Sequence, residues 1–166
     1  MIDKFGKSIL TLFGIGYFKY APGTAASIVT CVLWLLLYSF KINFLLLAFL
    51  YLIVLLCSII LIDKLTKIFT EIDAKEIVID EFLGMSLALF PFYAYLAVRE
   101  SWHGMDDFSG ATIACFILFR FFDIVKPFPI NLIDKKLKNG LGVVLDDLIA
   151  GLFSLLIVWI TIFYIL

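Results

Sequence analysis

Charged residues are scarce in this chain of 166 residues. Asp, Glu, Lys and Arg make up 16% of it, whereas about 25% is usual in a soluble domain. Hydrophobic residues make up 64%, and the mean hydropathy is +1.13. A particle of this size has too much surface for its volume to hide so many apolar side chains. We therefore expect lipid to surround much of the chain.

Side chains that bind zinc are also scarce. The three cysteines, Cys31, Cys57 and Cys115, lie in apolar stretches without metal-ligand spacing, and we expect them to be buried, inert thiols. His103 is the only histidine. Any metal site must then be built from oxygen ligands, which suit Mg²⁺, Mn²⁺ or Ca²⁺ rather than zinc.

Five apolar segments predict an all-α, polytopic helical membrane protein that forms a single domain over residues 1–166. A membrane-spanning helix needs about 20 residues, and lipid offers the backbone no hydrogen-bond partners outside the helix itself. The first and fourth segments are short for a full span, and Pro91 is expected to kink the third. The segments are Ala25–Phe40, Ile42–Ile62, Ile77–Val98, Ala111–Val125 and Leu148–Leu166.

Basic residues are distributed unequally between the two sides that these spans define. If the N-terminus is cytoplasmic, two of the 13 basic residues, Lys41 and Arg99, lie outside and the other 11 lie inside. This asymmetry predicts a cytoplasmic N-terminus and a C-terminus on the outer side. Aromatic residues near the outer ends are expected to form an interfacial belt of Tyr93, Tyr95, Trp102, Trp159 and Tyr164.

Acidic side chains collect at the predicted cytoplasmic ends of three helices. Asp80 and Glu81 open the third helix, Asp123 lies near the end of the fourth, and Asp146 and Asp147 precede the fifth. An acid at a helix N-terminus is favoured by the helix dipole by about 0.3–1 kcal/mol, which would explain any single one. The dipole does not explain adjacent acids, which repel each other, or an acid near a helix C-terminus.

The convergence of these carboxylates favours a metal site over separate structural roles. Crowded carboxylates become protonated unless a cation neutralises them. Arg120 and Lys126 add positive charge, as phosphate recognition needs, although Arg120 could simply pair with Asp123 three residues on. Because the group lies at the level of the cytoplasmic headgroups, a lipid phosphate is the simplest substrate.

Four stretches around these residues resemble the phosphatidylglycerophosphatase A family. They occur in family order: Ala21-Pro22-Gly23-Thr24 with Ser27, then residues 77–84, 119–130 and 142–151. The resemblance implies Mg²⁺-dependent hydrolysis of phosphatidylglycerophosphate to phosphatidylglycerol and phosphate. Two positions depart from the family pattern: Ala26 replaces a usual glycine, and Ala74 replaces the proline that commonly follows the acid matching Asp73.

The sequence and the resemblance together predict a phosphatase of phospholipid biosynthesis in the bacterial inner membrane, with its active site facing the cytoplasm. The predicted catalytic and metal-binding residues are Asp80, Glu81, Asp123, Asp146 and Asp147, which would hold one or two Mg²⁺ or Mn²⁺ ions. The predicted phosphate-binding residues are Arg120, Lys126 and Thr24. The expected partner is a phospholipid of the cytoplasmic leaflet and not a nucleic acid. The nucleophile, water or aspartate, and the oligomeric state stay open.

Other classes of membrane protein remain as alternatives. A small transporter or ion-pathway subunit would carry acids at several depths, whereas these acids cluster at one face. A lipid alcohol phosphotransferase would carry a spaced Asp-Gly and Ala-Arg glycine-rich signature, which is absent. A non-catalytic membrane interaction protein would not need so many converging acids.

Overall fold

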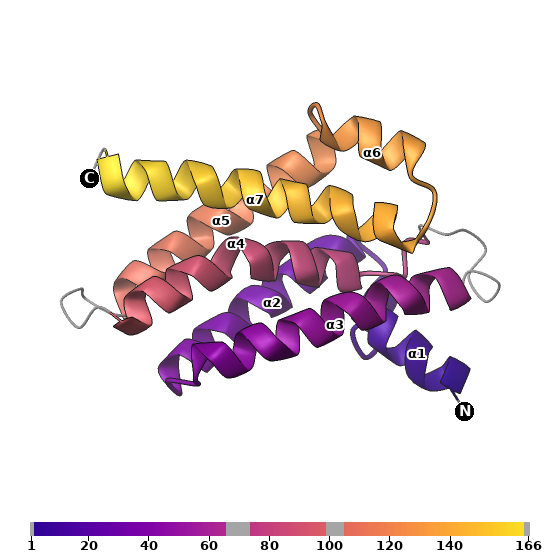
Figure 1. The fold of residues 1–166 in the computed structure, drawn as a ribbon, viewed down its shortest axis with the longest axis horizontal. Helices are drawn as coiled ribbons and strands as arrows, with labels where there is room; N and C mark the ends of the chain where they lie inside the picture. The colour runs from indigo at the N-terminus through magenta and orange to yellow at the C-terminus, as the bar shows by residue number, and fades with distance from the viewer. Residues whose placement is uncertain (1, 66–73, 99–104, 165–166) are drawn as a thin grey trace.

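The computed structural model describes residues 2–65, 74–98 and 105–164, and these residues form helices without any strand (Figure 1). The all-α fold class predicted from the sequence is therefore confirmed. The helices are α1 (Ile2–Leu10), η1 (Ile15–Tyr17, a 3₁₀ helix), α2 (Pro22–Ser39), α3 (Phe44–Leu65), α4 (Ile79–Val98), α5 (Met105–Val125), α6 (Ile130–Lys136) and α7 (Gly140–Tyr164). Predictions that concerned Asp73, Arg99, Trp102, His103 and the side chain of Tyr164 lie outside the described residues.

Four of the described helices, α2, α3, α5 and α7, are long and apolar enough to cross a membrane. Together with α4 they correspond to the five predicted segments. The two segments that looked short reach 18 and 21 residues, because α2 begins at Pro22 and α5 begins at Met105. The sequence did not reveal these starts, because the first turns of α2 and α5 contain polar residues that interrupt the apolar runs. The short helices α1, η1 and α6 were not predicted.

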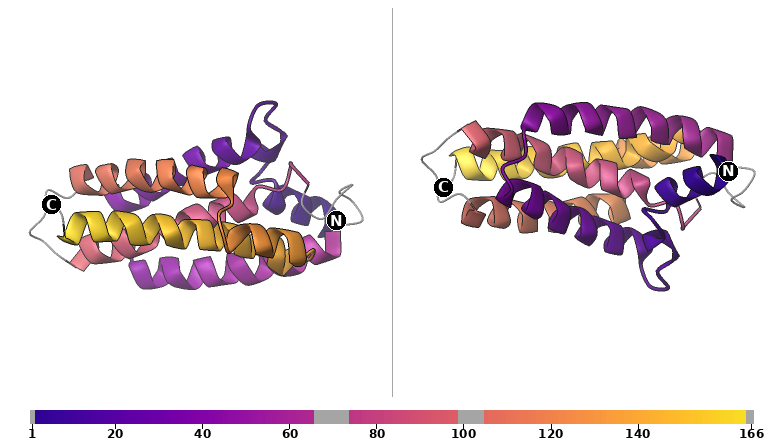
Figure 2. Two further views of the ribbon diagram at one scale, coloured as in Figure 1. Left: turned by 90° about the horizontal axis from the view of Figure 1, so that it is seen from above. Right: turned by 90° about the horizontal axis from the view of Figure 1, so that it is seen from below.

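Helix α4 lies at the centre of the bundle and contacts α2, α3, α5 and α7 (Figure 2). Its side chains Met85, Leu89 and Phe92 are buried in the main core. Trp34 of α2 donates a hydrogen bond from Nε1 to Ser86 Oγ at 2.9 Å. In lipid, where burying apolar surface gives little driving force, such close packing and interhelical hydrogen bonds hold helices together.

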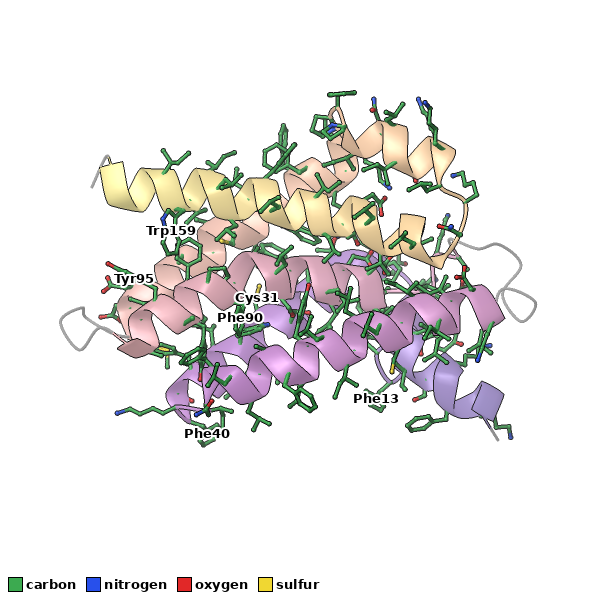
Figure 3. The ribbon with its side chains drawn as sticks, in the orientation of Figure 1. Phe13, Cys31, Phe40, Phe90, Tyr95 and Trp159 are labelled. Carbon is green, nitrogen blue, oxygen red and sulfur yellow. The ribbon has the colours of Figure 1, made fainter. Side chains whose placement is uncertain are left out.

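The predicted aromatic belt is wrong for Tyr93. Its side chain is 1% exposed, and its hydroxyl donates to the carbonyl oxygens of Leu37, at 3.2 Å, and Ile42. Tyr93 therefore joins α4 to the end of α2 and the turn that follows, where helix-end carbonyls need donors. Tyr95 and Trp159 do lie together at the end predicted to be outside, with ring centroids 5.6 Å apart (Figure 3).

The expectation of three buried thiols is also wrong in part. Cys115 is buried and Cys31 is half-buried, but Cys57 is exposed. Position 57 lies on a face of α3 that the other described helices do not cover. In a membrane this face meets lipid, which suits an apolar thiol as well as a protein core does.

Helix α7 begins at Gly140, before the acidic pair and not after it. Asn139 Oδ1 accepts a hydrogen bond from the Gly142 N–H at 2.9 Å, which satisfies one of the free donors at the helix start. Asp146 and Asp147 therefore lie inside the helix. The sequence missed this start because the apolar run is interrupted at the acids.

Candidate active site

The candidate site lies at one end of the bundle, on the right of Figure 1, where the starts of α2, α4 and α7 meet the end of α5. Asp80 and Glu81 occupy the first turn of α4, and Asp123 lies in the last turn of α5. Asp147 interacts electrostatically with Asp80, Glu81, Asp123 and Asp146. The structure thus brings all five predicted acids together.

Two glycines set the distance between α4 and α7. A Cβ atom at Gly84 would lie 2.5 Å from the carbonyl oxygen of Asp147, and one at Gly151 would collide with the carbonyl oxygen of Gly84. Both obstacles are backbone atoms, which cannot rotate aside. The helices therefore cross in backbone contact, and this crossing brings Asp147 beside Asp80 and Glu81.

Three carboxylates form the centre of the site. One oxygen from each of Asp80, Glu81 and Asp147 lies within 4.8 Å of the others, and Asp80 and Asp147 are 6% and 3% exposed. Glu81 Oε2 is buried and has no hydrogen-bond partner among the described residues. Oxygens that share a Mg²⁺ ion at its usual bond length lie at most about 4.2 Å apart. After small side-chain rotations, these three residues fit a divalent cation, and we call them the carboxylate triad.

Asp123 and Arg120 form a pair beside the carboxylate triad. Asp123 Oδ2 lies 2.7 Å from Arg120 Nη1, so the i,i+3 pairing considered from the sequence is present. Arg120 Nε is buried and has no hydrogen-bond partner among the residues that the structure describes. The guanidinium can thus keep its ion pair with Asp123 through Nη1 and still offer the Nε–H donor to an anion.

Asp146 has a basic partner of its own, Lys126. Lys126, just beyond α5, donates from Nζ to Asp146 and, at 3.2 Å, to Asp134 Oδ1 of α6. Partial burial disfavours the charged ammonium, but the two carboxylates outweigh it and raise the pKa of Lys126 above its ordinary value. Lys126 therefore stays positively charged and neutralises part of the acidic cluster. Sequence reasoning missed Asp134, because its pairing depends on how α6 folds back onto α7.

The first turn of α2 forms another wall of the site. A Cβ atom at Gly23 would collide with Glu81 Oε1 and would lie 3.3 Å from Arg120 Nη1. A side chain at position 23 would therefore displace the Glu81 carboxylate from its position, whereas glycine leaves it in place. Thr24 is the next residue in the same turn and is half-buried.

The sequence matches a known family over nearly its whole length. Residues 8–162 match the family model described as Phosphatidylglycerophosphatase A. This chain belongs to the phosphatidylglycerophosphatase A family. The resemblance seen in the four sequence stretches is therefore confirmed, and the family identifies the chain as a phosphatase.

Three curated relatives support the assignment. The protein named Phosphatidylglycerophosphatase A of Haemophilus influenzae is 36% identical over 147 residues, which cover 89% of this chain and 82% of the relative. The Escherichia coli K12 protein of that name is 30% identical over 145 residues, covering 86% and 74%. A Bacteroides thetaiotaomicron protein named Putative phosphatidylinositol-3-phosphatase is 34% identical over 152 residues, covering 89% and 87%. No solved structure matches the chain.

Proposed function

We propose that this protein hydrolyses phosphatidylglycerophosphate to phosphatidylglycerol and phosphate at the cytoplasmic surface of the bacterial inner membrane. The observation that carries the proposal is the carboxylate triad, which is enclosed between α4 and α7 beside Arg120. Family membership and the names of two relatives support the choice of substrate.

The carboxylate triad would hold Mg²⁺, with Mn²⁺ as a substitute, because these ions prefer oxygen ligands. A bound Mg²⁺ ion would supply positive charge that polarises the phosphoryl group. Asp146 and Asp123 would complete the acidic environment, as outer ligands or as the base that orients water. Five carboxylates are grouped with two basic side chains, Arg120 and Lys126, in the part of the chain that the structure describes. This excess of negative charge supports binding of a cation.

Arg120 is the best-placed residue to bind the phosphate. Its Nε is buried and unsatisfied within the described residues, and a planar guanidinium matches the geometry of phosphate oxygens. Two of the three donors on Lys126 Nζ go to Asp134 and Asp146, so we assign Lys126 first to Asp146 and only then to a phosphate. Thr24 would contribute its hydroxyl from the first turn of α2.

The orientation in the membrane is part of the same proposal. The end that carries the site also carries Lys4, Lys7 and Lys19 near α1, and Lys135 and Lys136 in the last turn of α6. Lys41 lies in the turn between α2 and α3, at the opposite end. Basic residues favour the cytoplasmic side, where a lipid phosphate would meet the site directly.

A phosphate on an inositol headgroup is the second candidate substrate, because the Bacteroides relative is named for it. Purified protein in lipid nanodiscs should be assayed for phosphate release from phosphatidylglycerophosphate, phosphatidylinositol 3-phosphate and phosphatidic acid. We expect the highest kcat/KM for phosphatidylglycerophosphate. A higher value for the inositol lipid would replace the proposed substrate, and no release from any of the three would refute the function.

A further inference from the structure

The segment between α1 and α2 carries four aromatic side chains that the described part of the protein leaves uncovered. Phe13 is 82% exposed, Tyr17 54%, Phe18 60% and Tyr20 71%. Phe13 has a φ angle of 55°, a backbone conformation that bulky residues rarely adopt. Its backbone is thus held in an unfavourable region while its ring stays outside the core, at the edge of the molecule in Figure 3.

This segment projects sideways from the bundle near the end that carries the site (Figure 2). In a bundle that spans a membrane, a loop directed into water would extend beyond the helix ends. A sideways projection at that level instead lies over the lipid that surrounds the helices. The exposed rings are therefore placed at the depth of the headgroups.

Lysines accompany the exposed rings. Lys7 Nζ lies 5.6 Å from the centroid of the Tyr17 ring, and Lys19 Nζ lies 5.4 Å from that of Tyr20. Aromatic rings mixed with Lys or Arg are typical of segments that lie in the membrane interface, where the rings enter the acyl boundary and the ammonium groups meet acidic headgroups. The charge of the segment is thus complementary to an anionic lipid surface.

Buried contacts fix the segment to the bundle. Leu10 is fully buried in the cluster that α1 forms with α3, and the Val78 N–H donates to the Leu10 carbonyl at 2.9 Å. At its other end the segment leads through Ala21 and Pro22 to Gly23, whose backbone contacts the Glu81 carboxylate. Movement of the segment would therefore be transmitted to a wall of the site.

We propose that residues 13–20 form an interfacial anchor that inserts its aromatic rings among acidic phospholipid headgroups beside the site. The anchor holds the first turn of α2, and with it one wall of the site, at the depth where a lipid phosphate lies. The inference rests on the proposed function for the membrane level of the site, and it is independent of the chemistry there.

Spin-label accessibility tests the anchor without measuring activity. The protein carries one label at Phe13→Cys or Phe18→Cys, in a background with Cys31, Cys57 and Cys115 replaced by alanine. It is reconstituted into equimolar phosphatidylcholine and phosphatidylglycerol. The collision rate of the spin label with oxygen, which is enriched in lipid, is compared with its collision rate with a water-soluble nickel chelate. Ile53→Cys on the exposed face of α3 is the lipid control, and Asn139→Cys, exposed at the end that carries the site, is the water control.

We expect labels at positions 13 and 18 to favour oxygen over the nickel chelate, as the label at 53 does, and the label at 139 to do the reverse. Labels at 13 and 18 that match position 139 would overturn the anchor. Shielding from both reagents together with spin–spin broadening would also overturn it, because a second copy of the chain would then cover the rings. If the background fails to fold, the fluorescence that Phe18→Trp adds to that of the three native tryptophans replaces the labels, and its quenching by lipids brominated near the headgroup is compared with that of the parent.

The lysines provide the matched test of the acidic partner. The combined change Lys7→Gln and Lys19→Gln should make the label at position 18 shallower in vesicles that contain phosphatidylglycerol and leave it unchanged in pure phosphatidylcholine. Lys41→Gln, at the opposite end of the bundle, should change neither. An identical depth for the double variant and its parent in both vesicles would refute the role of acidic headgroups.

Discussion

Substitution of Asp147 distinguishes a metal-binding role from a structural role more clearly than substitution of any other acid of the site. It lies in the second turn of α7, so it is not placed to cap the start of that helix. Asp80 is the second residue of α4, where asparagine loses only the helix-dipole interaction of about 0.3–1 kcal/mol besides the charged ligand. Replacing either with asparagine therefore removes a charged ligand and little else.

The first prediction concerns these two acids. Asp80→Asn and Asp147→Asn should each lower turnover at least about a hundredfold, because a preorganised charge at the reacting group is lost. Expression and melting in detergent should stay close to those of the parent. Asp106→Asn, an exposed acid at the start of α5, is the matched control and should keep parental activity. Near-parental turnover in both site variants would show that the acids serve only helix-end electrostatics.

The second prediction concerns Lys126. Lys126→Met removes the ammonium partner of Asp146, which is 5% exposed and lies among other carboxylates. The loss in free energy of unfolding should therefore exceed the roughly 1 kcal/mol that a surface ion pair contributes. Asp134→Asn keeps the pair between Lys126 and Asp146 and should cost less. Thermal unfolding in detergent measures both, and added Mg²⁺ should recover part of the loss in Lys126→Met. Equal melting temperatures for the two variants would contradict the assignment of Lys126 to Asp146.

At the scale of elements, the crossing of α4 and α7 determines whether the carboxylate triad exists. The third prediction is that Gly84→Ala destabilises the fold by about 1–3 kcal/mol, the range typical of overpacking, because the added Cβ meets the Asp147 backbone. Gly110→Ala is the control, since a Cβ atom there meets nothing within 4 Å. Melting curves of the two variants compare them directly. A Gly84→Ala protein as stable as Gly110→Ala would mean that the helices are not in backbone contact.

The elements also show what the sequence could and could not predict. Apolar runs located the five long helices, and the positions of the acids relative to these runs predicted that the acids meet at one end of the bundle. The start of α7 was missed because acids inside a helix look like the end of an apolar segment. Asp134 and the burial of Tyr93 were missed because each depends on contacts with a segment distant in the chain, which local patterns do not encode.

At the scale of the whole molecule, the unequal distribution of basic residues supports the proposed orientation. The fourth prediction is that Lys138→Cys, at the end that carries the site, reacts with a membrane-impermeant maleimide only when the reagent has access to the cytoplasmic face, as in permeabilised cells. Lys41→Cys, at the opposite end, should react in intact spheroplasts. Both changes are made in a background without the native cysteines. Labelling of position 138 from the outside alone would invert the proposed topology.

The central claim is that the carboxylate triad is a metal site that acts on a lipid phosphate. The fifth prediction tests it with the purified, reconstituted protein, stripped of metal and assayed on phosphatidylglycerophosphate with increasing Mg²⁺. We expect no turnover in excess EDTA, restoration of turnover by Mg²⁺ and also by Mn²⁺, and little restoration in Asp147→Asn at the same metal concentrations. Full turnover by the stripped protein in excess EDTA would contradict the account.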